Sequence, residues 1–303
     1  MDNDSNKYKG CLVGLAIGDC LGAPFEFKSP ENLQVYFANH ELDMIDFSMF
    51  NETFPAGYYT DDTSMMICLA ESLVEKGYDI KDQFARYQKW LLEGYATPYG
   101  KDSYGVGQQT FKSLRSPLLE LEAMNGFNHK AGGNGSLMRC APIGLKYENY
   151  QEIIEKSLIS SYATHNYFIA GWCCAVLNLA IRLILEGNRK EIIPNKIIEL
   201  CGDDLPEEIS EVLSHNFVLM DKYHSKISGY SVDTLRIAFW SWQTSENYEE
   251  SIKKVILLGH DTDTFAAVTG ALTGCYYGFD SIPTTWTQKL LNNDHIIDLA
   301  EKL

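Results

Sequence analysis

Two short stretches of aspartate and threonine, far apart in the chain, are the residues best suited to chemistry. The first, Thr60-Asp61-Asp62-Thr63, follows the turn-like Pro55-Ala56-Gly57 and precedes a helical run from Ser64 to Lys76. Thr60 is well placed as an N-cap, with both carboxylates in the first turn. A cap that complements the helix dipole explains this motif by itself, so the stretch alone does not indicate a metal site.

The second stretch changes that interpretation. Gly259 to Thr264 has the sequence GHDTDT and also precedes an apolar helix, which begins at Phe265. Carboxylates and threonine hydroxyls are the hard oxygen ligands that Mg²⁺, Mn²⁺ or Ca²⁺ prefer. Four carboxylates crowded without a cation would repel one another strongly. If the stretches meet in space, we expect them to hold two octahedral cations through Thr60, Asp61, Asp62, Asp261, Asp263 and Thr264.

A third motif, Gly132 to Arg139 (GGNGSLMR), is dense in glycine. Backbone N–H groups in such a loop can face an anion, and a helix is expected to start after it. The loop lacks the Gly-Lys-Ser/Thr of a Walker motif and the spacing of a GxGxxG dinucleotide loop. An ordinary turn is the alternative that composition leaves open.

Two single residues carry little information alone. Pro24 ends the first helix and leaves Glu26 in the loop beyond it, where a lone glutamate is usually solvated surface. His165 follows Thr164 at the start of an apolar helix, where a histidine more often caps the helix or satisfies the core than takes part in catalysis.

These motifs must be positioned by helices. Val13, Ile17 and Leu21 recur at four-residue spacing, and similar spacing continues along most of the chain. We therefore predict an all-α fold, a compact bundle of many helices. No Pro-, Gly- or Ser-rich linker divides the 303 residues, so we expect one domain over 1–303. The pattern is weakest over 186–230, which we expect to form helices and loops in a peripheral layer.

Two of the predicted helices carry a small residue at every fourth position, namely Gly10, Gly14, Gly18 and Gly22 in one, and Ala266, Gly270, Gly274 and Gly278 in the other. A glycine inside a helix costs about 1 kcal/mol relative to alanine. Four-residue spacing places these residues on one face, where another backbone can approach closely. We hypothesise that both helices are central and tightly packed, with each other as candidate partners. Unrelated close contacts explain the spacing equally well.

Composition excludes some classes of function. The formal net charge of −16 disfavours binding to a nucleic-acid backbone but allows a nucleotide held through a cation. None of the eight cysteines forms a CxxC pair and the N-terminus is polar, so we expect a reduced, cytoplasmic protein. Asn178 and Arg182 interrupt the apolar stretch 167–185, which favours a core helix over a membrane span. With no long apolar seam, we expect a monomer.

Six blocks together resemble the ADP-ribosylglycohydrolase family, to which the dinitrogenase reductase-activating glycohydrolases belong. They occur in the family's order and span nearly the whole chain: GLAIGDCLGAPFEF, YTDDTSMMICLAESL, GGNGSLMRCAPIG, THNYFIAGWCCAVLNLAI, GYSVDTLRIAFWSW and LGHDTDTFAAVTGALTG. The resemblance implies an orthogonal helix bundle with a binuclear Mg²⁺ or Mn²⁺ centre in a cleft, and it assigns the Asp/Thr stretches to that centre.

The same resemblance implies roles for other residues. Asp62, Asp263 and Glu26 fall where the family places catalytic groups, with Glu26 near the scissile bond. Substrate contacts are implied for Asn134, Gly135 and Ser136 at the diphosphate, His165 at a ribose, and Tyr230 near the nucleotide. Gly105 stands about where some arginine-specific members carry an acid, which nearby Asp102 could replace. His260 stands where a small or amide residue is commoner.

The predicted activity is removal of ADP-ribose from a modified protein side chain, with arginine as the first choice of linkage. A serine-linked or free ADP-ribose derivative is the alternative substrate. A rival role is an immunity-type protein that neutralises an ADP-ribosyltransferase by hydrolysis, by blocking it, or by both, although Met1 to Lys9 is short for such a blocking segment. A non-catalytic ADP-ribose-binding protein and a purely structural helical protein are further rivals. The intact metal motifs argue against both.

Overall fold

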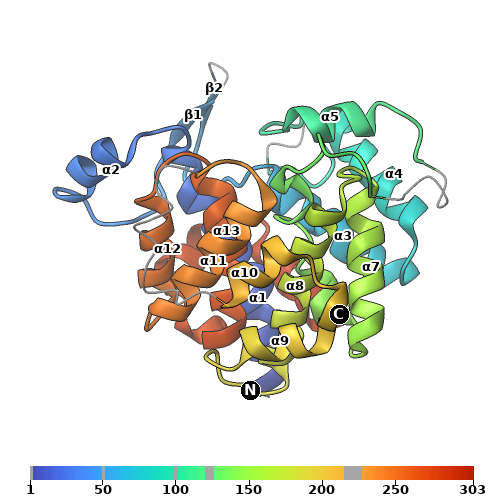
Figure 1. The fold of residues 1–303 in the computed structure, drawn as a ribbon. Coiled ribbons are helices and arrows are strands. Elements are labelled where there is room, and N and C mark those ends of the chain that lie inside the picture. Colours follow the sequence, from blue (N-terminus) through green and yellow to red (C-terminus); the bar gives the residue numbers. More distant parts are fainter. Residues whose placement is uncertain (1–2, 50–51, 99–101, 120–125, 215–226) are drawn as a thin grey trace.

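The computed structural model describes residues 3–49, 52–98, 102–119, 126–214 and 227–303. Helices make up most of this part: α1 (Asn3–Gly22), α2 (Pro30–Phe37), α3 (Asp61–Lys76), α4 (Ile80–Glu93), α5 (Gln108–Leu114), α6 (Pro142–Lys146), α7 (Tyr150–Tyr162), α8 (Phe168–Leu185), α9 (Ile193–Cys201), α10 (Glu207–Ser214), α11 (Ser231–Thr244), α12 (Tyr248–Ile256), α13 (Thr262–Tyr277), α14 (Thr284–Lys289) and α15 (Asn293–Lys302). A small antiparallel hairpin joins β1 (Phe47–Met49) to β2 (Glu52–Phe54). The all-α prediction is confirmed (Figure 1).

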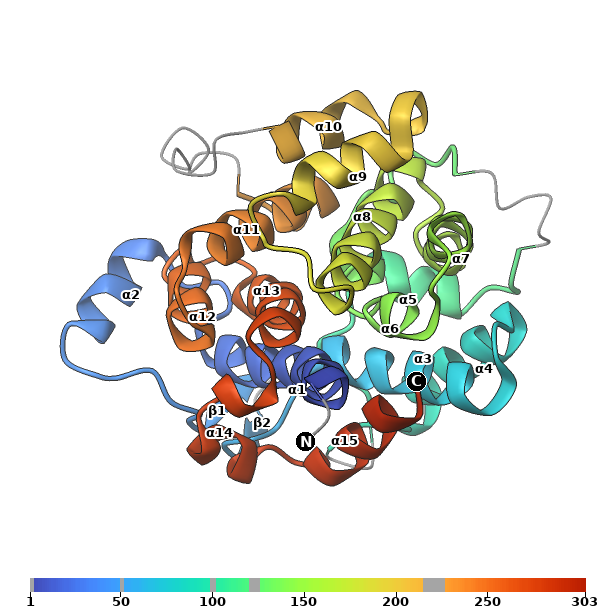
Figure 2. The same ribbon diagram turned by 90° about the horizontal axis from the view of Figure 1, so that it is seen from below.

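Helices α1 and α13 run side by side through the centre of the molecule (Figure 2). Their small residues face each other in antiparallel order: Gly10 meets Gly274, Gly14 meets Gly270, Gly18 meets Ala266 and Gly22 meets Thr262. A Cβ added to Gly18 would lie 2.1 Å from the Ala266 carbonyl oxygen. The hypothesis that the two glycine helices pack on each other is therefore confirmed. Gly278 differs from the other glycines, because it ends α13 with φ of 83°.

This antiparallel contact, called the glycine seam below, positions the site. Because the helices run in opposite directions, the end of α1 lies beside the start of α13. The 3₁₀ turn η1 (Ala23–Phe25) continues from α1, and α3 packs against both central helices. The seam thus brings the first Asp/Thr stretch, the second one and Glu26 toward the same end of the bundle.

Helix α8 contains the apolar stretch singled out in the sequence. Its length and composition would suffice to cross a membrane, as would the sharply bent pair formed by α1 and α2, but 83% of α8 is buried inside the protein. Asn178, in the middle of α8, accepts from the Gly144 N–H at 2.9 Å and donates to Ser157 Oγ at 3.0 Å. The interrupting amide therefore joins α8 to α6 and α7, as a core helix requires.

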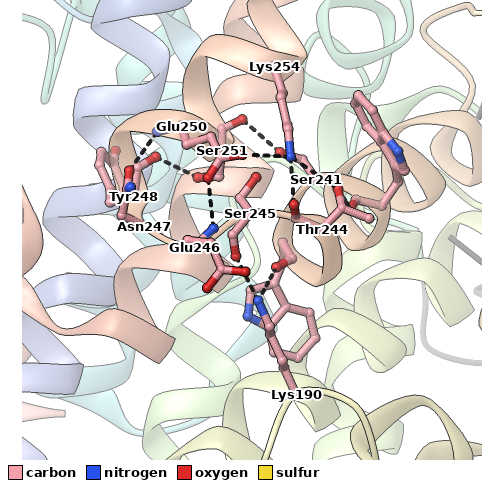
Figure 3. A network of polar contacts seen from close by, with 12 residues as sticks. Lys190, Ser241, Thr244, Ser245, Glu246, Asn247, Tyr248, Glu250, Ser251 and Lys254 are labelled. Atoms are coloured by element: carbon pink, nitrogen blue, oxygen red, sulfur yellow. Dashed lines mark hydrogen bonds and ion pairs between the residues drawn. The ribbon is translucent and has the colours of Figure 1, made fainter. Parts of the chain in front are cut away.

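The joint between α11 and α12 is held by two lysines, Lys190 from the segment before α9 and Lys254 from α12 itself (Figure 3). Lys190 donates to the Ser245 carbonyl at 2.7 Å, and Lys254 donates to the Thr244 carbonyl at 2.6 Å. These carbonyls lie at the end of α11, where helix carbonyls lack intrahelical partners and attract cations. Tyr248 at the start of α12 donates to the Gly14 carbonyl at 2.6 Å, which ties the joint to the glycine seam.

The region 186–230 contains α9 and α10, which lie at one edge of the bundle (Figure 2). Their inward residues, Ile197 and Ile209 among them, pack into the main core, and their other faces are exposed. This matches the peripheral layer expected from the weak pattern. Residues 215–226 of that region lie outside the described part of the chain.

Candidate metal centre and cleft

A buried aspartate that the sequence analysis did not select organises the first Asp/Thr stretch. Asp19 lies near the end of α1 with no exposed surface. Its carboxylate accepts the N–H groups of Thr60 and Thr63, at 3.0 and 3.1 Å, and their hydroxyls, at 2.8 and 2.6 Å. Asp19 therefore caps α3 from another helix. A single acid between Gly18 and Cys20 in an otherwise apolar, small-residue helix was the sequence signal for it.

Thr60 occupies the N-cap position of α3, as predicted, but makes no capping bond with its own side chain. Its hydroxyl lies 2.8 Å from Asp19 Oδ1 and 3.1 Å from Asp62 Oδ2. The hydroxyl hydrogen is thus directed at carboxylates. This leaves an oxygen lone pair for an electropositive partner.

The second stretch forms the facing half of the site. Carboxylate oxygens of Asp261, Asp263 and Glu26 lie within 4.8 Å of one another, a grouping that could hold a metal ion. Asn134 donates from Nδ2 to Asp261 Oδ2 at 2.8 Å and so fixes that carboxylate. Asp263 and Thr264 are buried. Glu26 therefore joins the acidic group directly.

The two halves share one space, because Asp61, Asp261 and Asp263 line the same cleft. Burial raises the pKa of Asp61 and Asp62 well above the ordinary value, and the charge of Asp19 adds to it. Burial likewise raises the pKa of Asp263 well above the ordinary value, and the charges of Glu26 and Asp62 raise it further. The pKa of Glu26 rises to about 8, through burial and then Asp261 and Asp19. The Asp/Thr stretches therefore converge, as the metal hypothesis requires.

This cluster fits a hard cation. Asp62 Oδ1 is buried and has no hydrogen-bond partner among the described residues, and a buried carboxylate oxygen left unpaired is costly. Its neighbours are oxygen donors of the kind that Mg²⁺ and Mn²⁺ select. Asp19 differs from them, because its oxygens already accept bonds from Thr60 and Thr63. We therefore assign Asp19 to orienting the threonines and the other acids to facing a cation.

The cluster forms one end of a cleft of about 950 Å³. The β1–β2 hairpin and α5 stand at this end of the bundle, which is the upper end in Figure 1. The lining includes two sets of residues: the acidic set Glu26, Asp61, Asp261, Asp263 and Thr264, and the set Gly133, Asn134, Gly135 and His165. The cleft thus brings carboxylates and a glycine-rich loop together, and Asn134 joins them through its bond to Asp261.

The glycine-rich loop is held from behind by the segment before α11. The Asn134 N–H donates to the Gly229 carbonyl at 3.0 Å, and Ser231 N–H donates to the Gly132 carbonyl at 3.0 Å. Residues 134–136 form a 3₁₀ turn, η3 (Asn134–Ser136). Side chains are excluded here: a Cβ on Gly135 would lie 2.9 Å from His165 Cε1. Glycine therefore permits the close packing of the loop on His165.

The predicted substrate residues divide into two groups. Gly105, Asn134, Gly135 and His165 line the cleft. Ser136, Tyr230 and Asp102 do not.

The side chains of these three residues make other contacts or point to solvent. The Ser136 hydroxyl pairs with Ser161 Oγ at 2.8 Å in the interior, because η3 turns it inward. Tyr230 donates to Glu208 at 3.0 Å, which points its hydroxyl at α10. Asp102 is exposed. Among the described residues, Asp102 therefore does not line the cleft beside Gly105.

Gly105 has a steric reason to be glycine. Its φ is 82°, and an added Cβ would lie 2.5 Å from Asp61 Oδ1. An acid at this position would collide with the Asp61 carboxylate. The preceding Tyr104 hydroxyl donates to the Tyr59 carbonyl, which fixes the loop over the start of α3.

The rim of the cleft contains two non-glycine residues in left-handed conformation. Phe27 has φ of 61° and His260 has φ of 63°. They are joined by backbone bonds, from Phe27 N–H to the His260 carbonyl at 2.7 Å and from His260 N–H to the Lys28 carbonyl at 3.2 Å. This pairing secures the loop of Glu26 to the loop of Asp261. The His260 ring is exposed at the rim.

Comparisons with known proteins agree along the whole chain. The family model described as ADP-ribosylglycohydrolase matches residues 1–303. ADP-ribosylarginine hydrolase Tri1 of Serratia proteamaculans is 30% identical over 98% of this chain and 79% of its own length. Human ADP-ribosylhydrolase ARH3 is 29% identical over 98% and 93%. A solved structure titled "ADP-ribosylglycohydrolase-related protein complex" superposes with a TM-score of 0.79 at 30% identity, covering 100% of this chain and 98% of its own.

Proposed function

This chain belongs to the ADP-ribosylglycohydrolase family, and from that premise we propose that it removes ADP-ribose from arginine side chains of proteins. The chain is a glycosidic-bond hydrolase that removes ADP-ribose. One observation carries the proposal: Asp61 of α3 lines the same cleft as Asp261 and Asp263 at the start of α13 and the glycine-rich loop. Asp62 is buried next to Asp61, and the charge of Asp261 helps to raise its pKa.

The two ends of the cleft match the two kinds of group in ADP-ribose. Its diphosphate requires N–H donors, which a glycine loop at a helix or turn start supplies. The glycosidic ribose has neutral hydroxyls that suit a cation centre. We therefore place the diphosphate along Gly133 to Gly135 and the reacting sugar beside Glu26 and Asp263.

We propose two divalent cations, Mg²⁺ or Mn²⁺, at the acidic end. The residues that would hold them are Thr60, Asp61, Asp62, Asp261, Asp263 and Thr264, with Glu26 facing the same space. The buried, unpaired Asp62 Oδ1 supports this assignment. Cations bound there supply a polarised water and an anchor for the ribose hydroxyls.

The protein residues supply the remaining chemistry. Hydrolysis breaks the bond from the anomeric carbon through an oxocarbenium-like transition state, which nearby carboxylates stabilise. Glu26 faces the cleft from the loop after α1 and is our candidate for positioning the substrate or transferring a proton. Asp19 keeps Thr60 and Thr63 in place from behind, and Asn134 does the same for Asp261.

Linkage is the finer part of the proposal. The relatives named as ADP-ribosylarginine hydrolases favour arginine. The glycine at position 105, where some arginine-specific members carry an acid, favours a different linkage such as serine. We choose arginine, because the named relatives match over nearly the whole chain.

The test is turnover of defined arginine-linked and serine-linked ADP-ribosyl peptides, with Mg²⁺, with Mn²⁺ and after chelation. We expect release of ADP-ribose from the arginine peptide with either metal and none after chelation. Cleavage of the serine peptide alone would reject the linkage. Full activity after thorough chelation would reject the metal centre.

We also infer a reducing, cytoplasmic setting. All eight cysteines are free and buried. Burial raises the pKa of Cys20 and Cys173 well above the ordinary value, which keeps them as inert thiols. Fractionation of cells that express the tagged protein tests the location, and recovery outside the cytoplasm would reject it.

A further inference from the structure

Arg139 is a buried cation paired only with neutral groups in the described part of the chain. Its exposed fraction is 1%. The guanidinium donates to the Gly135 carbonyl and to Thr164 Oγ1, and it lies 4.5 Å from the centre of the Tyr87 ring. No salt bridge to Arg139 occurs among the described residues. Burying a charge without a counter-ion is costly, so this arrangement calls for a compensating role.

The two donor arms of Arg139 lead to two residues of the cleft wall. Nη1 lies 2.7 Å from the Gly135 carbonyl oxygen. Nη2 lies 2.7 Å from Thr164 Oγ1, which in turn lies 2.9 Å from His165 Nδ1. Gly135 and His165 both line the cleft, whereas Arg139 and Thr164 lie behind them. One guanidinium therefore holds both the glycine loop and the imidazole.

The direction of these bonds favours one tautomer of the imidazole. Arginine only donates hydrogen bonds, so Thr164 Oγ1 accepts from Arg139. Among the described contacts, the acceptor within reach of the Thr164 hydroxyl hydrogen is His165 Nδ1. Nδ1 is then unprotonated and Nε2 carries the hydrogen. Nε2 faces the loop, 3.1 Å from where a Cβ on Gly135 would lie. Burial, with Arg139 adding to it, lowers the pKa of His165 to about 3, which keeps the ring neutral.

The bond to Gly135 also orients the loop. A trans peptide places its carbonyl and its N–H on opposite sides. With the Gly135 carbonyl drawn to Arg139, the N–H of Ser136 points away from the guanidinium. The bond from Arg139 therefore keeps the Gly135–Ser136 peptide in one orientation.

We propose that Arg139 and Thr164 are positioning residues for the substrate site. They fix His165 as the neutral tautomer with its hydrogen on Nε2, and they hold the Gly135 peptide, so that ring and loop together donate hydrogen bonds to oxygens of ADP-ribose. The inference rests on the proposed function, because it names the ligand. Neither residue touches the ligand itself.

The test uses ¹⁵N-histidine-labelled full-length protein and the variant Thr164→Val, which keeps the side-chain shape and removes the hydroxyl. In the wild type we expect the His165 Nδ1 resonance of an unprotonated, hydrogen-bonded nitrogen and a protonated Nε2 from pH 5 to 8. In Thr164→Val the Nδ1 resonance should move to that of a nitrogen without a hydrogen bond. Affinity for ADP-ribose, measured by calorimetry, should fall about tenfold, or ~1.4 kcal/mol.

Controls separate this role from simple damage. Thr164→Ser should restore both the resonance and the affinity. Thr273→Val removes a buried hydroxyl inside α13 and should change neither. Mn²⁺ affinity should stay constant in every variant, since the acidic end is untouched. Arg139→Met should weaken ADP-ribose binding more than Thr164→Val does, because it releases the Gly135 carbonyl as well.

Two results would overturn the inference in distinguishable ways. A wild-type spectrum with the hydrogen on Nδ1, or a Thr164→Val variant with wild-type affinity, rejects the positioning role and leaves the enzyme function intact. Failure of the wild type itself to bind ADP-ribose rejects the proposed function together with this inference.

Discussion

The glycine seam and the acidic cluster are neighbouring regions of the helix bundle. In each of them, chemically similar groups lie unusually close together. In the seam, backbone meets backbone: a Cβ on Gly274 would lie 2.0 Å from the Gly10 carbonyl oxygen. In the cluster, carboxylate meets carboxylate, and the pKa values of Asp61, Asp62 and Asp263 are all raised. The seam is complete with the chain alone, because every close group has a partner that fits. The carboxylates of the cluster instead repel one another, and a bound cation would offset that repulsion.

This difference indicates how the fold remains stable despite the repulsion among the carboxylates of its site. Close packing along the seam and burial around it stabilise the native state, and that stability offsets the repulsion among the carboxylates. Substitutions in the seam should therefore act on folding, whereas substitutions in the cluster should act on metal binding and turnover and leave folding nearly unchanged or improved. Five experiments test this division, in order of decreasing effect.

The largest effect is expected from Gly18→Leu. A Cβ at this position meets the Ala266 carbonyl at 2.1 Å, and backbone cannot move aside as a flexible side chain can. We expect loss of the folded protein, seen as loss of the cooperative thermal transition. Gly107→Leu is the matched control, because a Cβ at Gly107 has nothing within 4 Å. An unchanged melting temperature in Gly18→Leu would contradict the tight seam.

Next comes Asp263→Asn in the cluster. Turnover should fall roughly a thousandfold, because a cation-facing carboxylate is lost. The melting temperature without metal should stay the same or rise, because one buried charge is removed. Steady-state rates and calorimetry measure the two effects, with exposed Asp203→Asn as control. A folded variant with full activity would remove Asp263 from the mechanism.

Metal binding should stabilise the wild type. At a free concentration a hundred times the dissociation constant, Mg²⁺ or Mn²⁺ should add about 2.7 kcal/mol to the free energy of unfolding. Thermal unfolding with added metal and after chelation measures it. The Asp263→Asn variant should respond less. Identical melting curves of the wild type with and without metal would contradict the centre.

Asp19→Asn tests the link between the two regions, since Asp19 belongs to a seam helix and serves the cluster. An amide has one acceptor oxygen, so it cannot accept all the bonds that Thr60 and Thr63 now donate to the carboxylate. Metal affinity should fall about 10- to 100-fold, as for other supports of metal ligands. Titration with Mn²⁺ measures it. Unchanged affinity would show that the threonines need no such support.

The smallest effect concerns pH and His165. Its folded pKa of about 3 lies below the ordinary 6.5, so the folded state binds fewer protons and loses stability as pH falls below 6.5. By pH 5 this loss reaches about 2 kcal/mol. Because the carboxylates titrate too, the quantity to compare is wild type against His165→Asn by denaturant unfolding at pH 7 and pH 5. Equal pH dependence would contradict the buried neutral ring.

The sequence predicted the seam and the cluster with different success. Four-residue spacing showed that Gly14 and Gly270 lie on packing faces, but a spacing does not name its partner. The two Asp/Thr motifs predicted which acids converge, because each stands at a helix start. Asp19 was missed, because one acid inside a helix looks like surface until its neighbours are known to be buried.

Loop residues were harder to predict. Ser136 and Tyr230 fall in the expected segments, yet their hydroxyls bond to Ser161 and Glu208 instead of facing the cleft. Side-chain direction in a turn depends on backbone angles that composition does not encode. Gly105 shows the same limit, because its close approach to Asp61 depends on a φ of 82°.

The register of α1 against α13 in the seam also fixes the relative positions of the residues in the candidate metal centre. Each residue advances a helix by about 1.5 Å. A one-residue slip of α1 against α13 would therefore displace Glu26 from Asp261 by more than the tolerance of a metal–oxygen bond, and a full-turn slip by about 5 Å. A slip of one to three residues would take the glycines of one helix away from those of the other, so the close contact excludes those registers. The spacing that allows the helices to touch thus also sets the length of chain between Gly10 and Glu26, where insertions and deletions should be rare among working relatives.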